Sequence, residues 1–170
     1  MKNLIKLLLF AFLSISVLIA CDDDDSNPTD NGNDSDAPLS CNISGDVNMF
    51  FEANNLVYQN VPDEDVIIRT LTATMVYEGN GHTMNIVLRD PNGNFQKSYQ
   101  LGEEDGQAVC YFLYGQGSGL PFINYVVDIS GRVDFSVLTD TKAVGTFNFV
   151  AETVDGSKSI TVTNGKINKK

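Results

Sequence analysis

Side chains that do chemistry as metal ligands or nucleophiles are few in this chain of 170 residues. His82 is the only histidine, and Cys41 and Cys110 lie far from it and from each other in the sequence. A zinc site needs three or four such ligands at spacings that bring them together. We therefore expect no metal and no cofactor. We expect His82 to lie in the turn that its glycine-rich surroundings, EGNGH, indicate.

Nucleophilic catalysis has no convincing motif either. Ser118 lies in GQGSG, where Gln116 takes the place of the first glycine of a Gly-x-Ser-x-Gly turn. A triad would have to use His82, and no pattern brings it near Ser118 or Cys110. Glycosidases use paired carboxylates, but most acids here stand beside turn residues, where a solvated charge is ordinary. The sequence predicts no catalytic residues, with a hydrolase as the less favoured alternative.

An aromatic stretch, CYFLYGQGSGLPFINY at residues 110–125, is the most suggestive one for binding. Aromatic rings stack on the apolar faces of sugars and peptides, while amide and hydroxyl groups hydrogen-bond to the polar atoms. The alternative is a central strand that buries aromatics on both faces, with glycines that only make a wide turn. The candidate ligand-binding residues are Tyr114, Gln116, Ser118, Phe122 and Tyr125.

Cys21 ends an apolar run at residues 4–20 that follows two lysines, which is the arrangement of a secretory signal peptide. Its last residues, LIAC, resemble the bacterial lipobox. The resemblance implies cleavage between Ala20 and Cys21, a diacylglyceryl thioether on Cys21, and often a further acyl chain such as palmitate on the new amine. Several acyl chains give stable membrane attachment. The alternative is an uncleaved signal anchor with an incidental cysteine.

The next segment, through residue 40, carries seven acids and no Lys or Arg. With almost no apolar residues it cannot offset the entropy of ordering, so residues 21–40 are predicted to be a lipidated, disordered tether. Acids directly after the lipidated cysteine resemble the export signal of surface lipoproteins in Bacteroidetes-type bacteria. By that resemblance Asp22, Asp23, Asp24 and Asp25 direct the protein to the outer face of the outer membrane. A periplasm-facing position is the alternative.

Charge excludes one class of partner. After removal of residues 1–20, 9 basic side chains face 22 acidic ones. An acidic protein without a basic stripe repels phosphate backbones, so nucleic acid is not expected as a partner. Residues 41–170 are enough for a single domain with a real core.

Alternating apolar and polar residues, the pattern of half-buried strands, recur through that domain. Turn residues separate them at short intervals, as in EGNGH, DPNGN and VDGS. The sequence predicts an all-β fold, an antiparallel β-sandwich or barrel-like domain of about eight to ten strands. The apolar positions expected to face the core include Leu71, Ala73, Met75, Tyr77, Met84, Ile86, Leu88, Val133, Phe135, Val137, Phe147, Phe149, Ala151, Ile160 and Val162.

The end of the chain, GTFNFVAETVDGSKSITVTNGKI, resembles the C-terminal hairpin of small, uncharacterised Bacteroidetes lipoproteins. The residues that carry the resemblance are Gly145, Phe147, Phe149, Ile160, Val162, Thr163 and Gly165. The resemblance implies an all-β lipoprotein and no particular activity.

Cys41 and Cys110 are the two thiols left once Cys21 is lipidated, and an oxidising compartment favours a disulfide between them. A buried free thiol at Cys110 is the alternative. The favoured function is a non-catalytic, lipid-anchored lipoprotein of the outer membrane that binds a glycan or a partner protein. A structural accessory subunit of an outer-membrane assembly is the alternative.

Overall fold

The computed structural model describes residues 36–117 and 120–170, which form ten strands and confirm the predicted all-β fold. The cleavage residues Ala20 and Cys21, the aspartates at 22–25 and Ser118 lie outside the described residues. No helix within the described ranges has the length and apolarity needed to cross a membrane. The strands are β1 (Leu39–Gly45), β2 (Met49–Ala53), β3 (Leu56–Asp63), β4 (Val66–Tyr77), β5 (Asn80–Pro91), β6 (Ser98–Gln100), β7 (Ala108–Tyr114), β8 (Ile123–Leu138), β9 (Ala143–Thr153) and β10 (Ser159–Lys169).

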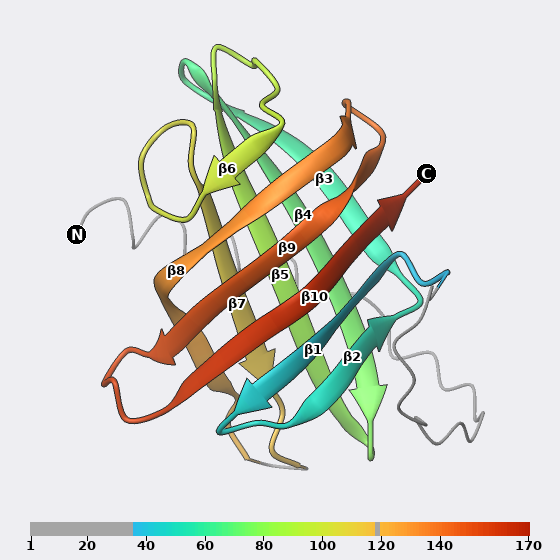
Figure 1. The fold of residues 1–170 in the computed structure, drawn as a ribbon, viewed down its shortest axis with the longest axis vertical. Coiled ribbons are helices and arrows are strands. Elements are labelled where there is room, and N and C mark those ends of the chain that lie inside the picture. The colour runs from blue at the N-terminus through green and yellow to red at the C-terminus, as the bar shows by residue number, and fades with distance from the viewer. Residues whose placement is uncertain (1–35, 118–119) are drawn as a thin grey trace. The chain divides into compact units, whose positions relative to one another are not determined.

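A single antiparallel sheet connects all ten strands. Hydrogen bonds link them in the order β2-β1-β10-β9-β8-β7-β5-β4-β3, with β6 beside β8. The order begins and ends at different strands, so the sheet is not closed. Figure 1 shows β1, β2, β8, β9 and β10 in a front layer whose strands cross those of β3, β4, β5 and β7 behind them. The sheet is therefore folded over on itself into a sandwich-like domain.

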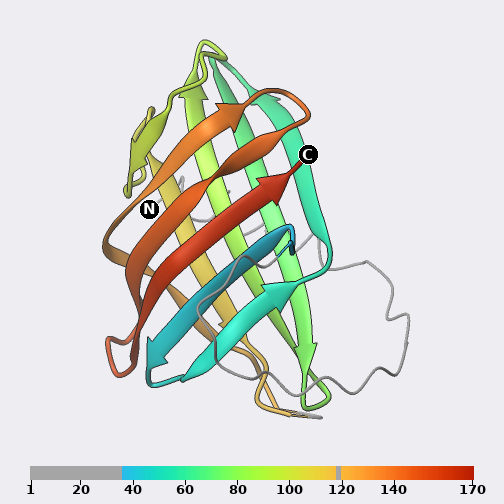
Figure 2. The same ribbon diagram turned by 45° about the vertical axis from the view of Figure 1, so that its right-hand side comes forward.

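The fold-over takes place along β8 on one side and between β2 and β3 on the other. β8 pairs with β7 near its start and with β6 further on, and its pairing with β9 shifts register three times. Such bulges bend a strand and let it pass from one layer to another. On the other side the chain leaves β2 and enters β3 at the back, as Figure 2 shows. On this open side the Glu52 N–H of β2 donates to Met75 Sδ of β4 at 3.3 Å.

The core lies between the two layers and consists of alternate residues from the long strands. Leu71, Met84, Ile86, Phe147 and Val162 are all buried, as predicted, together with Ala73, Leu88, Val133, Phe135, Phe149, Ala151 and Ile160. Met75 is partly buried and packs against the same core.

Three details differ from the sequence-based expectation. Tyr77 is 38% exposed instead of buried, because it is the last residue of β4 and stands at the end of the core. Val137 is 41% exposed instead of buried, because a register shift between Phe135 and Val137 breaks the alternation of side chains. β1 begins at Leu39, within the segment expected to be tether, because Leu39 is fully buried in the core.

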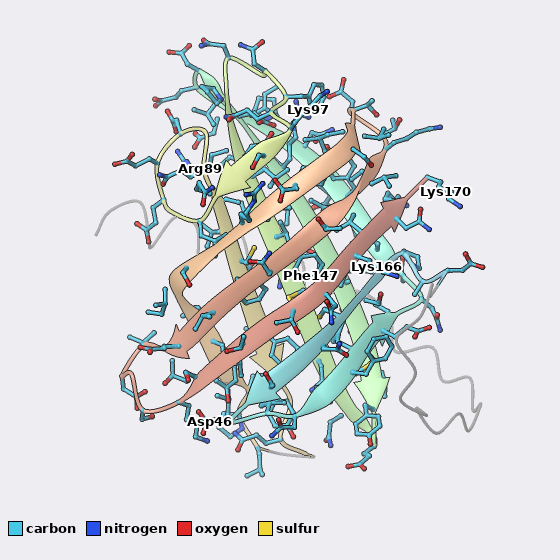
Figure 3. All side chains as sticks on the ribbon, viewed as in Figure 1. Asp46, Arg89, Lys97, Phe147, Lys166 and Lys170 are labelled. Atoms are coloured by element: carbon cyan, nitrogen blue, oxygen red, sulfur yellow. The ribbon has the colours of Figure 1, made fainter. Side chains whose placement is uncertain are left out.

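The strands bring the turns to two opposite ends of the domain. One end, called the loop end here, comprises residues 45–52, 75–82 and, in the third segment, 114–117 and 120–125. The other, called the arginine end, comprises the β3–β4 turn, residues 91–98 and the β8–β9 turn. Figure 3 shows Asp46 at the loop end and Lys97 at the arginine end. All candidate binding residues within the described ranges belong to the loop end.

Candidate functional site

The base of the loop end is a stack of aromatic rings on neighbouring strands. The His82 ring lies 4.9 Å from that of Tyr114 and 6.3 Å from that of Phe112, measured between centroids and nearly parallel to both. Phe112 in turn stacks on Tyr125 at 6.4 Å. The pairings His82↔Tyr114 and Phe112↔Tyr125 place these rings on adjacent strands. This aromatic stack packs directly beneath the loop end.

His82 is a buried strand residue and not the turn residue expected from its sequence neighbours. The two-residue turn between β4 and β5 holds Glu78 and Gly79, so β5 begins at Asn80 and includes His82, which is 1% exposed. The Gly115 N–H donates to His82 Nδ1 at 3.3 Å, which leaves the ring proton on Nε2. Burial lowers the pKa of His82, against a smaller opposite effect of the Tyr77 carbonyl. The imidazole is therefore neutral near pH 7.

Gly115 brings the β7–β8 loop directly onto the β4–β5 hairpin. A Cβ atom at Gly115 would lie 2.4 Å from the carbonyl oxygen of Gly81, far inside contact distance. Only glycine permits this approach. Within the loop, the Gln116 side-chain amide donates to the Pro121 carbonyl at 2.8 Å. The Leu120 N–H donates to the Gly117 carbonyl at 3.2 Å. The described part of the loop is thus held by its own hydrogen bonds.

The predicted binding residues are divided between surface and interior. Phe122 is 52% exposed, Gln116 is exposed, and Tyr114 is half-buried at the end of β7. Tyr125 is fully buried in the core, so it cannot contact a ligand on the surface. Its hydroxyl has no hydrogen-bond partner among the described residues. Burial, with smaller contributions from Asp46 and Tyr114, raises its pKa.

Other exposed apolar side chains of the loop end were not predicted from the sequence. Leu120 is 59% exposed, Val76 73%, Phe50 40% and Tyr77 38%. Each stands at the end of a strand or in a loop, where periodicity does not tell whether a side chain faces solvent. The signal available was the absence of Lys and Arg from all three segments of the loop end.

At the arginine end a buried charged cluster, also not predicted, joins five parts of the fold. The Arg69 Nε–H on β4 donates to Asp90 Oδ2 on β5 at 2.5 Å, and both side chains are at most 1% exposed. Arg69 Nη1 donates at 3.0 Å both to Asn60 Oδ1 and to Asp140 Oδ1. Nη2 donates to the Gly93 carbonyl at 3.3 Å.

Two aromatic residues complete this Arg69 cluster. The Tyr99 hydroxyl on β6 donates to Asp90 Oδ1. Burial and this hydrogen bond raise the pKa of Tyr99. The guanidinium carbon of Arg69 lies 3.9 Å from the centre of the Phe95 ring, a cation–π contact. Acceptors and a ring already surround the guanidinium, so its N–H groups are not available to bind a ligand. The cluster instead holds strands and turns together.

A shallow hollow of about 290 Å³ lies beside this cluster. Phe95, Lys97, Phe135 and Val137 line it together with Gln96, Ser136 and Leu138. It is at the lower limit of the roughly 300–1,000 Å³ of pockets that enclose small molecules. The hollow is therefore too small to enclose most small-molecule ligands.

Metal-binding and thiol groups stay separate in the structure. No group of three or more His, Cys, Asp or Glu side chains converges on a common point in the parts that the structure describes. Cys41 on β1 and Cys110 on β7 are both fully buried. Burial raises the pKa of Cys41, which makes it unreactive as a nucleophile. The Cys41–Cys110 disulfide stays a prediction, tested by the mass of the unreduced protein.

Comparisons of the chain with protein-family models, with curated proteins and with solved structures find no match.

Proposed function

We propose that this protein is a lipid-anchored, non-catalytic lipoprotein of the outer membrane whose loop end binds a partner at the cell surface. The acyl chains on Cys21 hold it on the membrane, the acidic segment that follows Cys21 serves as the tether, and the sandwich presents the loop end. The partner is a glycan or a protein.

One observation carries this proposal: several exposed apolar side chains lie at the loop end, above the aromatic stack. Phe122 and Leu120 project from a loop tied by its own hydrogen bonds, and Tyr77 and Val76 stand on the adjacent hairpin. Rigid, exposed aromatic and aliphatic side chains lose little conformational entropy on binding and supply most of the affinity of protein interfaces.

Binding is tested with a glycan array and with co-purification from envelope extracts, using the mature protein and its Phe122→Ala and Ile129→Ala variants. Ile129 on β8 is the matched control, since it is 53% exposed and lies outside the loop end. We expect Phe122→Ala to lose the partner with an unchanged thermal midpoint, and Ile129→Ala to keep it. Equal binding by both variants contradicts the proposal.

Attachment and export are tested by cell fractionation and surface labelling. We expect Cys21→Ser to leave the membrane fraction, and replacement of residues 22–25 by alanine to lower surface labelling while membrane attachment persists. Wild-type partitioning of Cys21→Ser contradicts the lipid anchor. Unchanged labelling of the alanine variant contradicts the role of the acids in export and leaves the periplasm-facing alternative.

A further inference from the structure

The exposed apolar residues of the loop end come from the start of β2, the end of β4 and the loop that leads into β8. β4, β5, β7 and β8 are consecutive in the sheet. The pairings Met75↔His82, His82↔Tyr114 and Tyr114↔Ile123 align them, and Tyr77 lies two residues beyond that level. At about 4.8 Å between strands, Tyr77 and the segment with Phe122 are roughly 14 Å apart. This distance suits a short peptide segment laid across the strand ends.

The open side of the sheet extends this surface to β2. The Glu52 N–H contacts Met75 Sδ there. β2 runs away from the loop end while β4 runs toward it, so Phe50 lies level with Tyr77.

The charges at this end of the domain are predominantly but not entirely negative, because the β9–β10 turn, where Ser159 is hydrogen-bonded to Asp46, supplies the cation Lys158. Asp46, Glu52 and Glu78 are exposed, and none of its three segments contains Lys or Arg. The adjacent β9–β10 turn adds Asp155 together with one cation, Lys158. The cations Arg69, Arg89 and Lys97 belong to the opposite end, as Figure 3 shows for Arg89 and Lys97. An apolar surface among acids complements a ligand that combines positive charge with large apolar side chains.

We propose that the occupant of the loop end is a cationic polypeptide segment in which Lys or Arg alternates with large apolar residues. This inference rests on the proposed function and specifies its partner. Phe122, Leu120 and Tyr77 contact the apolar side chains, and Glu78 and Asp46 attract the cations.

Two turn glutamates supply a matched pair of charge variants. Glu78 at the loop end has φ 51°, and Glu64 in the β3–β4 turn at the arginine end has φ 55°. Asparagine tolerates this left-handed conformation better than glutamate, so both substitutions remove one charge without straining the turn. A difference between Glu78→Asn and Glu64→Asn therefore reports the position of the charge and not the change in net charge.

The test measures fluorescence anisotropy of labelled peptides with the mature protein. The probe alternates lysine with phenylalanine, and the controls alternate lysine with serine and glutamate with phenylalanine. We expect binding of the first peptide alone, weakened by salt. Phe122→Ala should weaken it about tenfold or more, and Glu78→Asn roughly threefold, while Ile129→Ala and Glu64→Asn bind as wild type.

Each other outcome overturns a distinct part. Equal binding of the lysine–serine peptide, or equal effects of Glu78→Asn and Glu64→Asn, shows non-specific attraction and refutes the inference. A neutral glycan whose binding is lost in Phe122→Ala refutes the cationic partner and keeps the loop end as the binding surface. If Phe122→Ala alters neither peptide nor glycan binding, the inference and the proposed function both fail.

Discussion

Replacement of Arg69 by methionine tests whether the Arg69 cluster holds the arginine end together. Methionine keeps much of the volume of the side chain and removes its charge and all its donors. Asp90 then stays buried at 0% exposure with only the Tyr99 hydroxyl as a side-chain partner. Removal of one partner from a buried ion pair costs about 3–5 kcal/mol, because the other charge is left uncompensated.

A loss of this size is easily measured in a domain of this length. One kcal/mol corresponds to about 3–5 °C in the thermal midpoint, so the variant should melt roughly 10–20 °C below wild type. Circular dichroism during urea and thermal unfolding is the suitable measurement, since the chain has no tryptophan. The double variant Arg69→Met with Asp90→Leu should regain part of the loss, because apolar replacement of a whole buried pair is often close to neutral.

Arg132 supplies the matched control for the same chemistry at the surface. It forms a pair with Asp134 at 2.6 Å, with side chains 50% and 35% exposed. Exposed pairs contribute little to stability, so Arg132→Met should unfold at nearly the urea midpoint of wild type. Equal, small effects of Arg69→Met and Arg132→Met would refute the reasoning and show that the buried cluster is replaceable.

Three further predictions concern single residues. The imidazole signal of His82 in NMR spectra should titrate below pH 6.5, and a pKa at or above 6.5 contradicts its burial. Stability should therefore fall as the pH drops from 6.5 toward the lowered pKa of His82, and His82→Gln should remove that dependence. Gly131→Ala should lower the free energy of unfolding by about 1–3 kcal/mol, because φ at Gly131 is 145° and the added Cβ would lie 2.3 Å from the Asn148 carbonyl oxygen. Gly81→Ala, which has open space around its Cβ, should not change it. Equal losses of the two variants in urea unfolding would argue against steric strain. Hydrogen bonds from nearby hydroxyl and amide groups lower the pKa of Asp155 to about 2. The contribution of Asp155 to stability is therefore present above pH 4 and lost as the pH falls toward 2, and Asp155→Asn should reduce the change of stability between these two pH values. An unchanged loss of stability between pH 4 and 2 in this variant would show that the hydrogen bonds do not form in solution.

Most of the strands were predictable because their signal is local. Leu71 and Ala73 among threonines, or Phe147 and Phe149 among polar residues, show the period of two that only a half-buried strand satisfies. The pattern failed where backbone geometry interrupts it, as at Val137 after the bulge in β8. His82 was misplaced for a related reason: the tight turn uses only two residues, so the strand begins earlier than the glycine-rich sequence indicates.

The candidate site was predicted only in part. Phe122 and Gln116 lie on the surface as required, but Tyr125, three residues beyond Phe122, is buried. Alternation along a strand shows which of two such residues is exposed and which is buried only when the first residue of the strand is known. Phe50 and Tyr77 reach the loop end from strands that the sequence does not place side by side.

The sequence by itself determined the all-β class, the main core positions and the predictions of a lipidated cysteine and an acidic tether, because each depends on residues that are neighbours in the chain. Tertiary structure alone decided the Arg69 cluster, whose partners Asn60, Asp90 and Asp140 lie 9, 21 and 71 residues from Arg69. It also decided that acids and exposed apolar side chains share one end of the sandwich. The physical reason is that a folded-over antiparallel sheet brings together strand ends that are distant in the chain, and no local pattern records which ends will meet.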